Sequence, residues 1–181
     1  MIRISAIYQL ALILFLSIQY LNSQAQGPMS SELPQVTEEM LLNPSPADWL
    51  MFSRTFDNQR FSPLDQINRD NVNGLRLVWS RGMYPGTRQE SIPLVYKGVM
   101  YVANPRGIVQ AVDATNGDLI WEYERPLPDD IEDYIGIERT RTLSLYKDKL
   151  LYASPDGYVL ALGTDSGELH WETLAHDYKQ G

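Results

Sequence analysis

An internal repeat with an offset of 50 residues constrains the fold of this chain more than any other feature. Residues 96–122 (YKGVMYVANPRGIVQAVDATNGDLIWE) align without a gap with residues 146–172 (YKDKLLYASPDGYVLALGTDSGELHWE). Many positions are identical, and most of the others exchange like for like. A repeat with a period of about 20 to 50 residues predicts an architecture in which similar units pack side by side.

Each copy reads as four short apolar strands separated by turns. The strands are predicted at residues 92–96, 99–103, 108–112 and 119–121, and at 143–146, 150–153, 158–162 and 169–171. The segments 104–107 (NPRG) and 154–157 (SPDG) supply proline and glycine for tight hairpins. Four strands in a unit of about 40 to 50 residues are typical of a β-propeller blade. We therefore predict an all-β fold, a partial β-propeller of about two blades at residues 89–125 and 139–175.

A tryptophan closes each unit. The two strong copies share the pattern Ala-x-x-x-x-x-Gly-x-x-x-Trp, which ends at Trp121 and Trp171, and a weaker third copy ends at Trp79. A tryptophan at the same place in every unit can pack against the neighbouring blade and bury about 150 to 250 Å². We interpret these side chains as architectural rather than catalytic. Residues 26–88 are predicted to form an N-terminal segment with an outer strand.

The N-terminus predicts export. Arg3 precedes an apolar run at residues 10–18 (LALILFLSI), and residues 23–25 (SQA) offer a small-x-small cleavage site. The run is much shorter than the ~20 residues that a membrane-spanning helix needs. We therefore predict a signal peptide at residues 1–25 and a periplasmic mature chain that does not span the membrane. An uncleaved N-terminal anchor is the alternative.

Charge and cysteine content exclude several classes of function. The net charge is −8, and removing residues 1–25 takes away only one charged residue, Arg3. Such an acidic chain repels phosphate backbones, so we expect no nucleic-acid partner. The chain has no cysteine, which excludes disulfides, thiol catalysis and cysteine metal sites. Two isolated histidines form no metal site, and an acidic cluster that lacks calcium-loop spacing is interpreted as a solvated loop: Asp129, Asp130, Glu132 and Asp133.

Two segments carry a resemblance to a known family. Residues 111–121 (AVDATNGDLIW) match the tryptophan-docking motif of quinoprotein propellers, Ala-x-Asp-x-x-Thr/Ser/Asn-Gly-x-x-x-Trp. Residues 161–171 match it except at Gly163, which should remove a turn-stabilising acceptor without changing the fold. Residues 58–68 (NQRFSPLDQIN) and 75–79 (LRLVW) resemble the opening of the methanol/ethanol dehydrogenase branch of the quinoprotein (PQQ-dependent) alcohol dehydrogenases. The similarity covers residues 46–175 and is that of an N-terminal fragment.

The resemblance implies two cofactor-binding residues. In the family, the glutamate of a Gln-Glu-x-x-Pro motif hydrogen-bonds PQQ, and residues 89–93 (QESIP) place Glu90 at that position. An arginine before the first strand of the next blade contacts the cofactor, whose three carboxylates suit the paired hydrogen bonds of a guanidinium. Arg141 stands at that position, and Arg139 is the competing choice.

One departure from the family pattern bears on its chemistry. Most members of this branch carry adjacent cysteines a few residues before that arginine, where this chain has Ile135 and Gly136. A disulfide over the cofactor is therefore absent, which leaves sugar or polyol dehydrogenases of the same fold open.

The resemblance also implies what the chain lacks. The ligands of a Ca²⁺ or lanthanide ion, and the aspartate that acts as general base on the alcohol, are expected beyond residue 181. The fragment should therefore be inactive alone, as part of an enzyme that passes electrons to an acceptor such as a cytochrome c. A non-catalytic exported propeller scaffold is the alternative, and so is a ring assembled from several two-blade chains.

Overall fold

The computed structural model describes residues 33–84, 90–136 and 143–180, which belong to one compact unit. The predicted signal peptide lies outside these residues. No helix in the described part of the chain is both long and apolar enough to cross a membrane.

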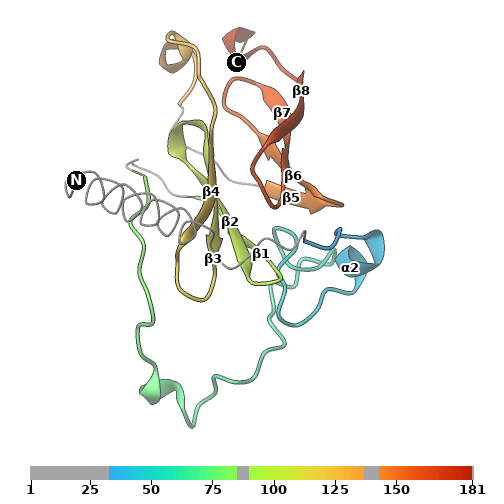
Figure 1. Cartoon of the computed structure of the whole chain (residues 1–181), viewed down its shortest axis with the longest axis vertical. Coiled ribbons are helices and arrows are strands. Elements are labelled where there is room, and N and C mark those ends of the chain that lie inside the picture. Colours follow the sequence, from blue (N-terminus) through green and yellow to red (C-terminus); the bar gives the residue numbers. More distant parts are fainter. Residues whose placement is uncertain (1–32, 85–89, 137–142, 181) are drawn as a thin grey trace, which may run out of the picture. The chain divides into compact units, whose positions relative to one another are not determined.

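Two four-stranded antiparallel sheets form the core of the unit (Figure 1). Their strands follow one another in sequence order, as in a meander. The first sheet contains β1 (Leu94–Tyr96), β2 (Val99–Asn104), β3 (Ile108–Asp113) and β4 (Leu119–Glu124). The second contains β5 (Leu143–Tyr146), β6 (Lys149–Ala153), β7 (Tyr158–Gly163) and β8 (Leu169–Leu174). The predicted all-β class and the four strands per unit are confirmed.

The two sheets repeat each other in detail. Each has a register shift between the third and fourth strands, at Ala111/Val112 and at Ala161/Leu162. The backbone bonds that close the β3–β4 turn, Asp113 N to Asp118 O and Gly117 N to Asp113 O, are both 2.8 Å long. In the second sheet Gly163 takes the place of the aspartate, and the equivalent bonds measure 2.8 and 2.9 Å. The loss of the aspartate therefore leaves the turn unchanged, as predicted.

One hydrophobic core runs through both sheets. Side chains alternate between the faces of a strand, so every second residue of the middle strands points inward. The fully buried residues are mostly large aromatic and aliphatic side chains of these strands, with two residues of the N-terminal segment: Tyr96, Tyr101, Tyr152, Leu94, Leu150, Leu160, Leu162, Val109, Val36 and Leu50.

Two of the three repeated tryptophans dock into the glycine turn of the following unit. The ring of Trp79 covers Gly117, and its Nε1 donates to the carbonyl of Ala114 at 3.1 Å. The ring of Trp121 covers Gly167 in the same way, and its Nε1 donates to the carbonyl of Thr164 at 3.0 Å. The architectural interpretation of these side chains is confirmed.

The third tryptophan, Trp171, is 46% exposed, whereas Trp121 is 8% exposed. Every residue of its strand, β8, is exposed. The socket that buries Trp121 belongs to the sheet that follows it. No further sheet follows β8 within the described residues, so the strand keeps an open face.

The N-terminal segment contributes few regular elements. It contains α2 (Glu38–Leu42), the 3₁₀ turn η1 (Val72–Gly74), and two isolated bridges, Val36 to Lys147 and Trp49 to Val95. Residues 75–79 form no strand here, and the outer strand expected within residues 26–88 stays a prediction. A strand requires a hydrogen-bonded neighbour, and none lies beside these residues in the described part of the chain. Leu77 and Val78 are consequently more than four-fifths exposed.

Candidate functional site

Antiparallel pairing places the start of each first strand beside the turn between the second and third strands. Leu94 of β1 pairs with Tyr101, and Leu143 of β5 pairs with Tyr152. We call this the proximal end; it comprises residues 90–93, 104–107, 124–132 and 154–157. The opposite, distal end carries the β3–β4 and β7–β8 turns, into which the tryptophans dock.

Glu90 lies at the proximal end, and its side chain is exposed. The next residue contacts the first sheet, because the hydroxyl of Ser91 accepts a hydrogen bond of 3.3 Å from the amide of Ala103 at the end of β2. An ionised carboxylate in this position can accept hydrogen bonds from the polar edge of a ligand. The geometry is thus compatible with the predicted role of Glu90 and does not test it.

The other predicted positions are described only in part. Arg141 and the competing Arg139 lie outside the described residues. Ile135 and Gly136 follow the 3₁₀ turn after β4; Ile135 is half-buried, and its amide donates to the carbonyl of Ile131 at 3.0 Å. A side chain at Gly136 would meet no atom within 4 Å. The juxtaposition of Glu90 with Arg141 therefore stays a prediction.

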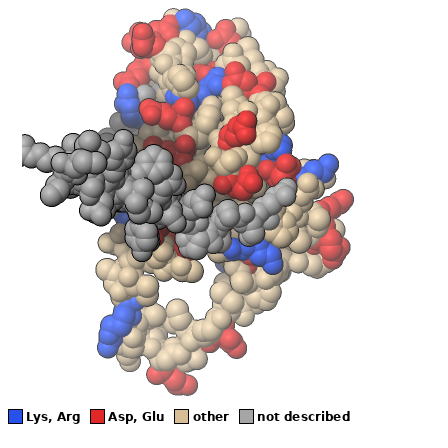
Figure 2. Space-filling view, viewed as in Figure 1, with Lys and Arg blue, Asp and Glu red and all other residues tan. Residues whose placement is uncertain are grey.

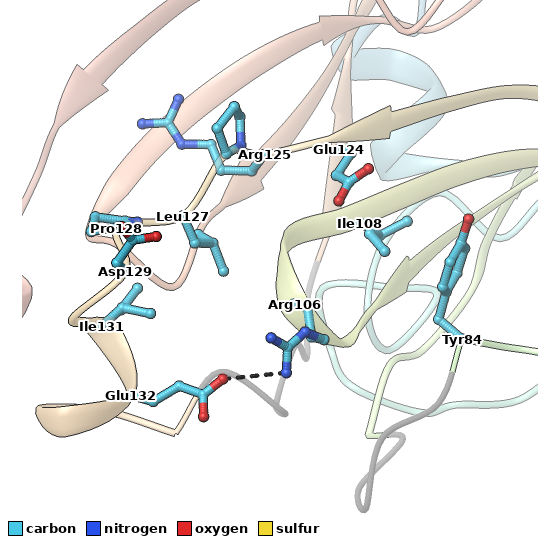
Figure 3. Close-up of a pocket in the computed structure, with 11 residues that line it drawn as sticks. Tyr84, Arg106, Ile108, Glu124, Arg125, Leu127, Pro128, Asp129, Ile131 and Glu132 are labelled. Atoms are coloured by element: carbon cyan, nitrogen blue, oxygen red, sulfur yellow. Dashed lines mark ion pairs between the residues drawn. The ribbon is translucent and has the colours of Figure 1, made fainter.

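A cavity of about 490 Å³ opens at the proximal end of the first blade (Figure 3). Its walls come from the β2–β3 turn, the end of β4 and the loop 126–132. Arg106 and Glu132 form an ion pair of 3.3 Å across it, and both side chains are exposed. Glu90 does not line this cavity. The walls carry both signs of charge, so the cavity shows no preference for an anionic or a cationic ligand.

Sequence reasoning missed a buried ionic cluster that joins the two blades at the proximal end. Arg125 follows β4 directly, and its Nε and Nη2 donate to Asp156 at 3.1 and 2.9 Å. Its Nη1 donates to Glu172, and the guanidinium lies over the ring of Tyr158, 4.5 Å from the centroid. Burial by itself would lower the pKa of Arg125, but the hydrogen bonds to the two carboxylates outweigh it and raise the pKa. Arg125 therefore stays charged at neutral pH.

A second network of hydrogen-bonded polar side chains extends into the first blade from the proximal end. Tyr84 donates to Glu122 at 2.8 Å, and this bond raises the pKa of the phenol. Gln110 donates to the other oxygen of Glu122 at 2.7 Å and accepts from Asn104 at 3.2 Å. Asn104 and Gln110 are buried, whereas the second blade has Ser154 and Leu160 at these positions.

Two acidic side chains of the loop after β4 form ion pairs with basic side chains elsewhere in the described residues. Asp130 accepts hydrogen bonds from Tyr178 at 2.6 Å and from Lys179 at 2.5 Å, and these bonds lower its pKa. Glu132 pairs with Arg106. Within residues 33–84, 90–136 and 143–180, no group of three or more acidic or histidine side chains is arranged to hold a metal ion. Charged side chains of both signs are interspersed on the face in Figure 2.

Two antiparallel four-stranded sheets, joined by the docked Trp121, define the chain as part of a β-propeller. A family model described as "Glucose/ethanol/alcohol dehydrogenase, beta-propeller domain", the PQQ family, matches residues 49–172. The chain therefore belongs to the family of PQQ-dependent alcohol dehydrogenases.

Relatives of known activity cover part of the chain. It is 44% identical over 88 residues to the dehydrogenase subunit of alcohol dehydrogenase (quinone) from Gluconacetobacter polyoxogenes, which covers 49% of this chain and 12% of that protein. It is 38% identical over 124 residues to the quinoprotein alcohol dehydrogenase PedH from Pseudomonas putida, which covers 67% of this chain and 20% of that protein.

Solved structures agree with the fold. A quinohemoprotein alcohol dehydrogenase from Pseudomonas putida superposes with a TM-score of 0.74 at 31% identity, covering 81% of this chain and 22% of the other. A europium-containing methanol dehydrogenase superposes with a TM-score of 0.68 at 28% identity, covering 77% and 25%. The chain thus spans between about an eighth and a quarter of the length of these relatives.

Proposed function

We propose that this chain supplies the first blades of an exported quinoprotein dehydrogenase that oxidises alcohols with PQQ in the periplasm. The observation that carries the proposal is the serial docking of Trp79 and Trp121, together with the family match over residues 49–172. Serial docking gives each blade a fixed place relative to the next. The ends at which β1 and β5 begin can therefore face one ligand together.

Glu90 and Arg141 are the residues that would hold PQQ. Glu90 presents an exposed side chain at the proximal end, next to Ser91, which is hydrogen-bonded to β2. This position suits a hydrogen bond to a polar edge of the cofactor. The guanidinium of Arg141 would pair with a cofactor carboxylate through charge-assisted hydrogen bonds. PQQ, when bound, supplies the two-electron oxidising group, and the protein supplies its binding and orientation.

The remaining chemistry is assigned to other parts of the enzyme. The ligands of a Ca²⁺ or lanthanide ion and the general base are expected outside these 181 residues, so the isolated chain should be inactive. The europium in a similar methanol dehydrogenase supports a lanthanide as one choice of ion. A similar 1-butanol dehydrogenase is named as cytochrome c-linked, which supports a cytochrome as the electron acceptor.

The test is a titration of the intact protein, including any sequence that continues this chain, with PQQ and Ca²⁺. Tight binding with alcohol-dependent dye reduction is expected. Glu90→Gln should weaken PQQ binding, whereas Glu168→Gln should not, because Glu168 is an exposed glutamate at the distal end. An intact protein that binds no PQQ would overturn the proposal in favour of the scaffold alternative. Equal effects of the two substitutions would remove Glu90 from the site.

A further inference from the structure

The contact between the two blades is fixed at its distal end by two hydrogen bonds to one carbonyl oxygen. The hydroxyl of Tyr101 and the Nε1 of Trp121 both donate to Thr164 O at 3.0 Å. The two rings are tilted by 45° with centroids 6.0 Å apart. All three groups are buried. This arrangement holds β2 and β4 of the first blade against the β7–β8 turn of the second.

At the proximal end of the same contact, Arg125 forms the buried ion pairs, and an exposed pair between Lys179 and Asp130 also joins the two blades. The side chain of Arg125 is 10% exposed and that of Asp156 is 5% exposed. The fork of the guanidinium bridges two carboxylates from different segments of the second blade, Asp156 in the β6–β7 turn and Glu172 in β8. A planar guanidinium can do this while it stacks on Tyr158, which an ammonium group cannot reproduce. The exposed pair between Arg106 and Glu132, by contrast, lies within the first blade.

Short backbone contacts connect Arg125 to the residues that precede β1. Its amide donates to the carbonyl of Gly107 at 3.0 Å, and a side chain at Gly107 would come within 2.9 Å of Arg125 Cβ. Gly107 ends the β2–β3 turn, and Ala103 at the start of that turn holds Ser91, next to Glu90. Arg125 thus bonds through its backbone to the turn beside Glu90 and through its side chain to the turn beside β5.

We propose that Arg125 is a positioning residue for the cofactor: it sets the separation between the starts of β1 and β5, and thereby between the groups that hold PQQ. The inference rests on the proposed function. Arg125 does not touch the cofactor in this account and acts through the two turns. Because the distal hydrogen bonds and the exposed Lys179–Asp130 pair hold the blades together independently, loss of Arg125 should loosen the proximal end without separating the blades.

The experiment compares three variants of the intact protein: Arg125→Met, Arg106→Met and Trp121→Phe. Arg106→Met removes the same charge from the same end, so it controls for the weaker long-range attraction of a cofactor with three carboxylates. Trp121→Phe removes the distal hydrogen bond, so it controls for loss of stability at the same contact. PQQ affinity is measured in the presence of Ca²⁺ at a temperature well below the Tm of every variant.

Arg125→Met should weaken PQQ binding by at least about fivefold, the lower end of the usual coupling between separate sites. Arg106→Met and Trp121→Phe should each change the PQQ affinity by less than about twofold. This should hold even if Trp121→Phe lowers the Tm as much as Arg125→Met does. Arg125→Lys should recover less than half of the loss, since it keeps the charge and not the fork. Equal PQQ affinity in Arg125→Met and the wild type would overturn the inference, and so would an equal loss in Arg106→Met. A wild-type protein that binds no PQQ would instead refute the proposed function.

Discussion

The substitution Gly167→Ala tests the docking of Trp121 directly. A Cβ at Gly167 would lie 2.6 Å from Cε3 and 2.8 Å from Cδ2 of Trp121, closer than van der Waals contact allows. The indole must therefore leave its socket or tilt within it. Gly98 provides a matched control, because its φ of +81° resembles the +70° of Gly167 while a Cβ there would meet no atom within 4 Å.

Both substitutions lose stability through the left-handed backbone, and only Gly167→Ala also loses it by displacing the indole. A left-handed backbone with a Cβ costs about 1 to 2 kcal/mol in both. In Gly167→Ala, exposing half of a buried indole of ~200 Å² adds about 2.5 kcal/mol, and the lost hydrogen bond to Thr164 adds about 1 kcal/mol. We therefore expect the free energy of unfolding to fall by about 4 to 6 kcal/mol for Gly167→Ala and by about 1 to 2 kcal/mol for Gly98→Ala.

Urea unfolding followed by far-UV circular dichroism measures both values, and the tryptophan emission of the folded state reports whether Trp121 has moved into water. Gly167→Ala should shift the emission to the red, and Gly98→Ala should leave it unchanged. Equal losses of stability in the two variants, with unchanged emission, would refute the docking as the reason for a glycine at residue 167. The backbone conformation alone would then explain it.

Three further outcomes follow from burial and charge. In the 181-residue chain, Trp121→Ala should lower the free energy of unfolding by about 3 to 5 kcal/mol, and Trp171→Ala should cost much less because Trp171 is already half-exposed, as measured by urea midpoints. Arg125→Met should cost about 3 to 5 kcal/mol by leaving a buried carboxylate unpaired, whereas Arg106→Met breaks an exposed pair and should cost less than about 1 kcal/mol. Hydrogen bonds within its turn lower the pKa of Asp113, so its contribution is present above the ordinary carboxyl pKa and is lost as the pH falls through the folded value. The Tm difference between the wild type and Asp113→Ala should accordingly be seen at pH 7 and shrink below pH ~4, and a constant difference would contradict this.

The strands and the tryptophan sockets could be predicted because both repeat. An offset of 50 residues aligns each strand of the first sheet with one of the second, so a pattern that is weak in a single copy is reinforced by its partner. The socket follows the same logic: Gly117 and Gly167 occupy equivalent positions, and each is covered by the tryptophan of the preceding unit. The outer strand predicted near Trp79 was supported only by the weak third copy of the repeat. Its backbone pairs with no neighbour in the described residues, so the docking of Trp79 does not by itself establish a strand there.

The ionic cluster could not be predicted in this way because it does not repeat. Arg125 aligns with Ala175, and Asp156 aligns with Arg106, so the comparison of the copies gives no sign that these two residues meet. Arginine after a strand and aspartate in a turn are ordinary on an exposed surface. Only the packing of one blade against the next brings them together and removes them from water.

The two copies of the repeat are alike at the distal end and differ in charge at the proximal end. At the distal end the two blades share the docking glycines and the same turn bonds, and Gly163 in place of aspartate changes nothing in the backbone. At the proximal end the charged positions diverge: Arg106 stands against Asp156, and Arg125 against Ala175. Blade packing requires the same shape at every junction, so the residues that serve it recur from unit to unit. Arg125 and Asp156, by contrast, serve one junction only, because the arginine of the first blade binds the aspartate of the second. Complementary shape is thus repeated at the distal end, whereas complementary charge at the proximal end is particular to this pair of blades.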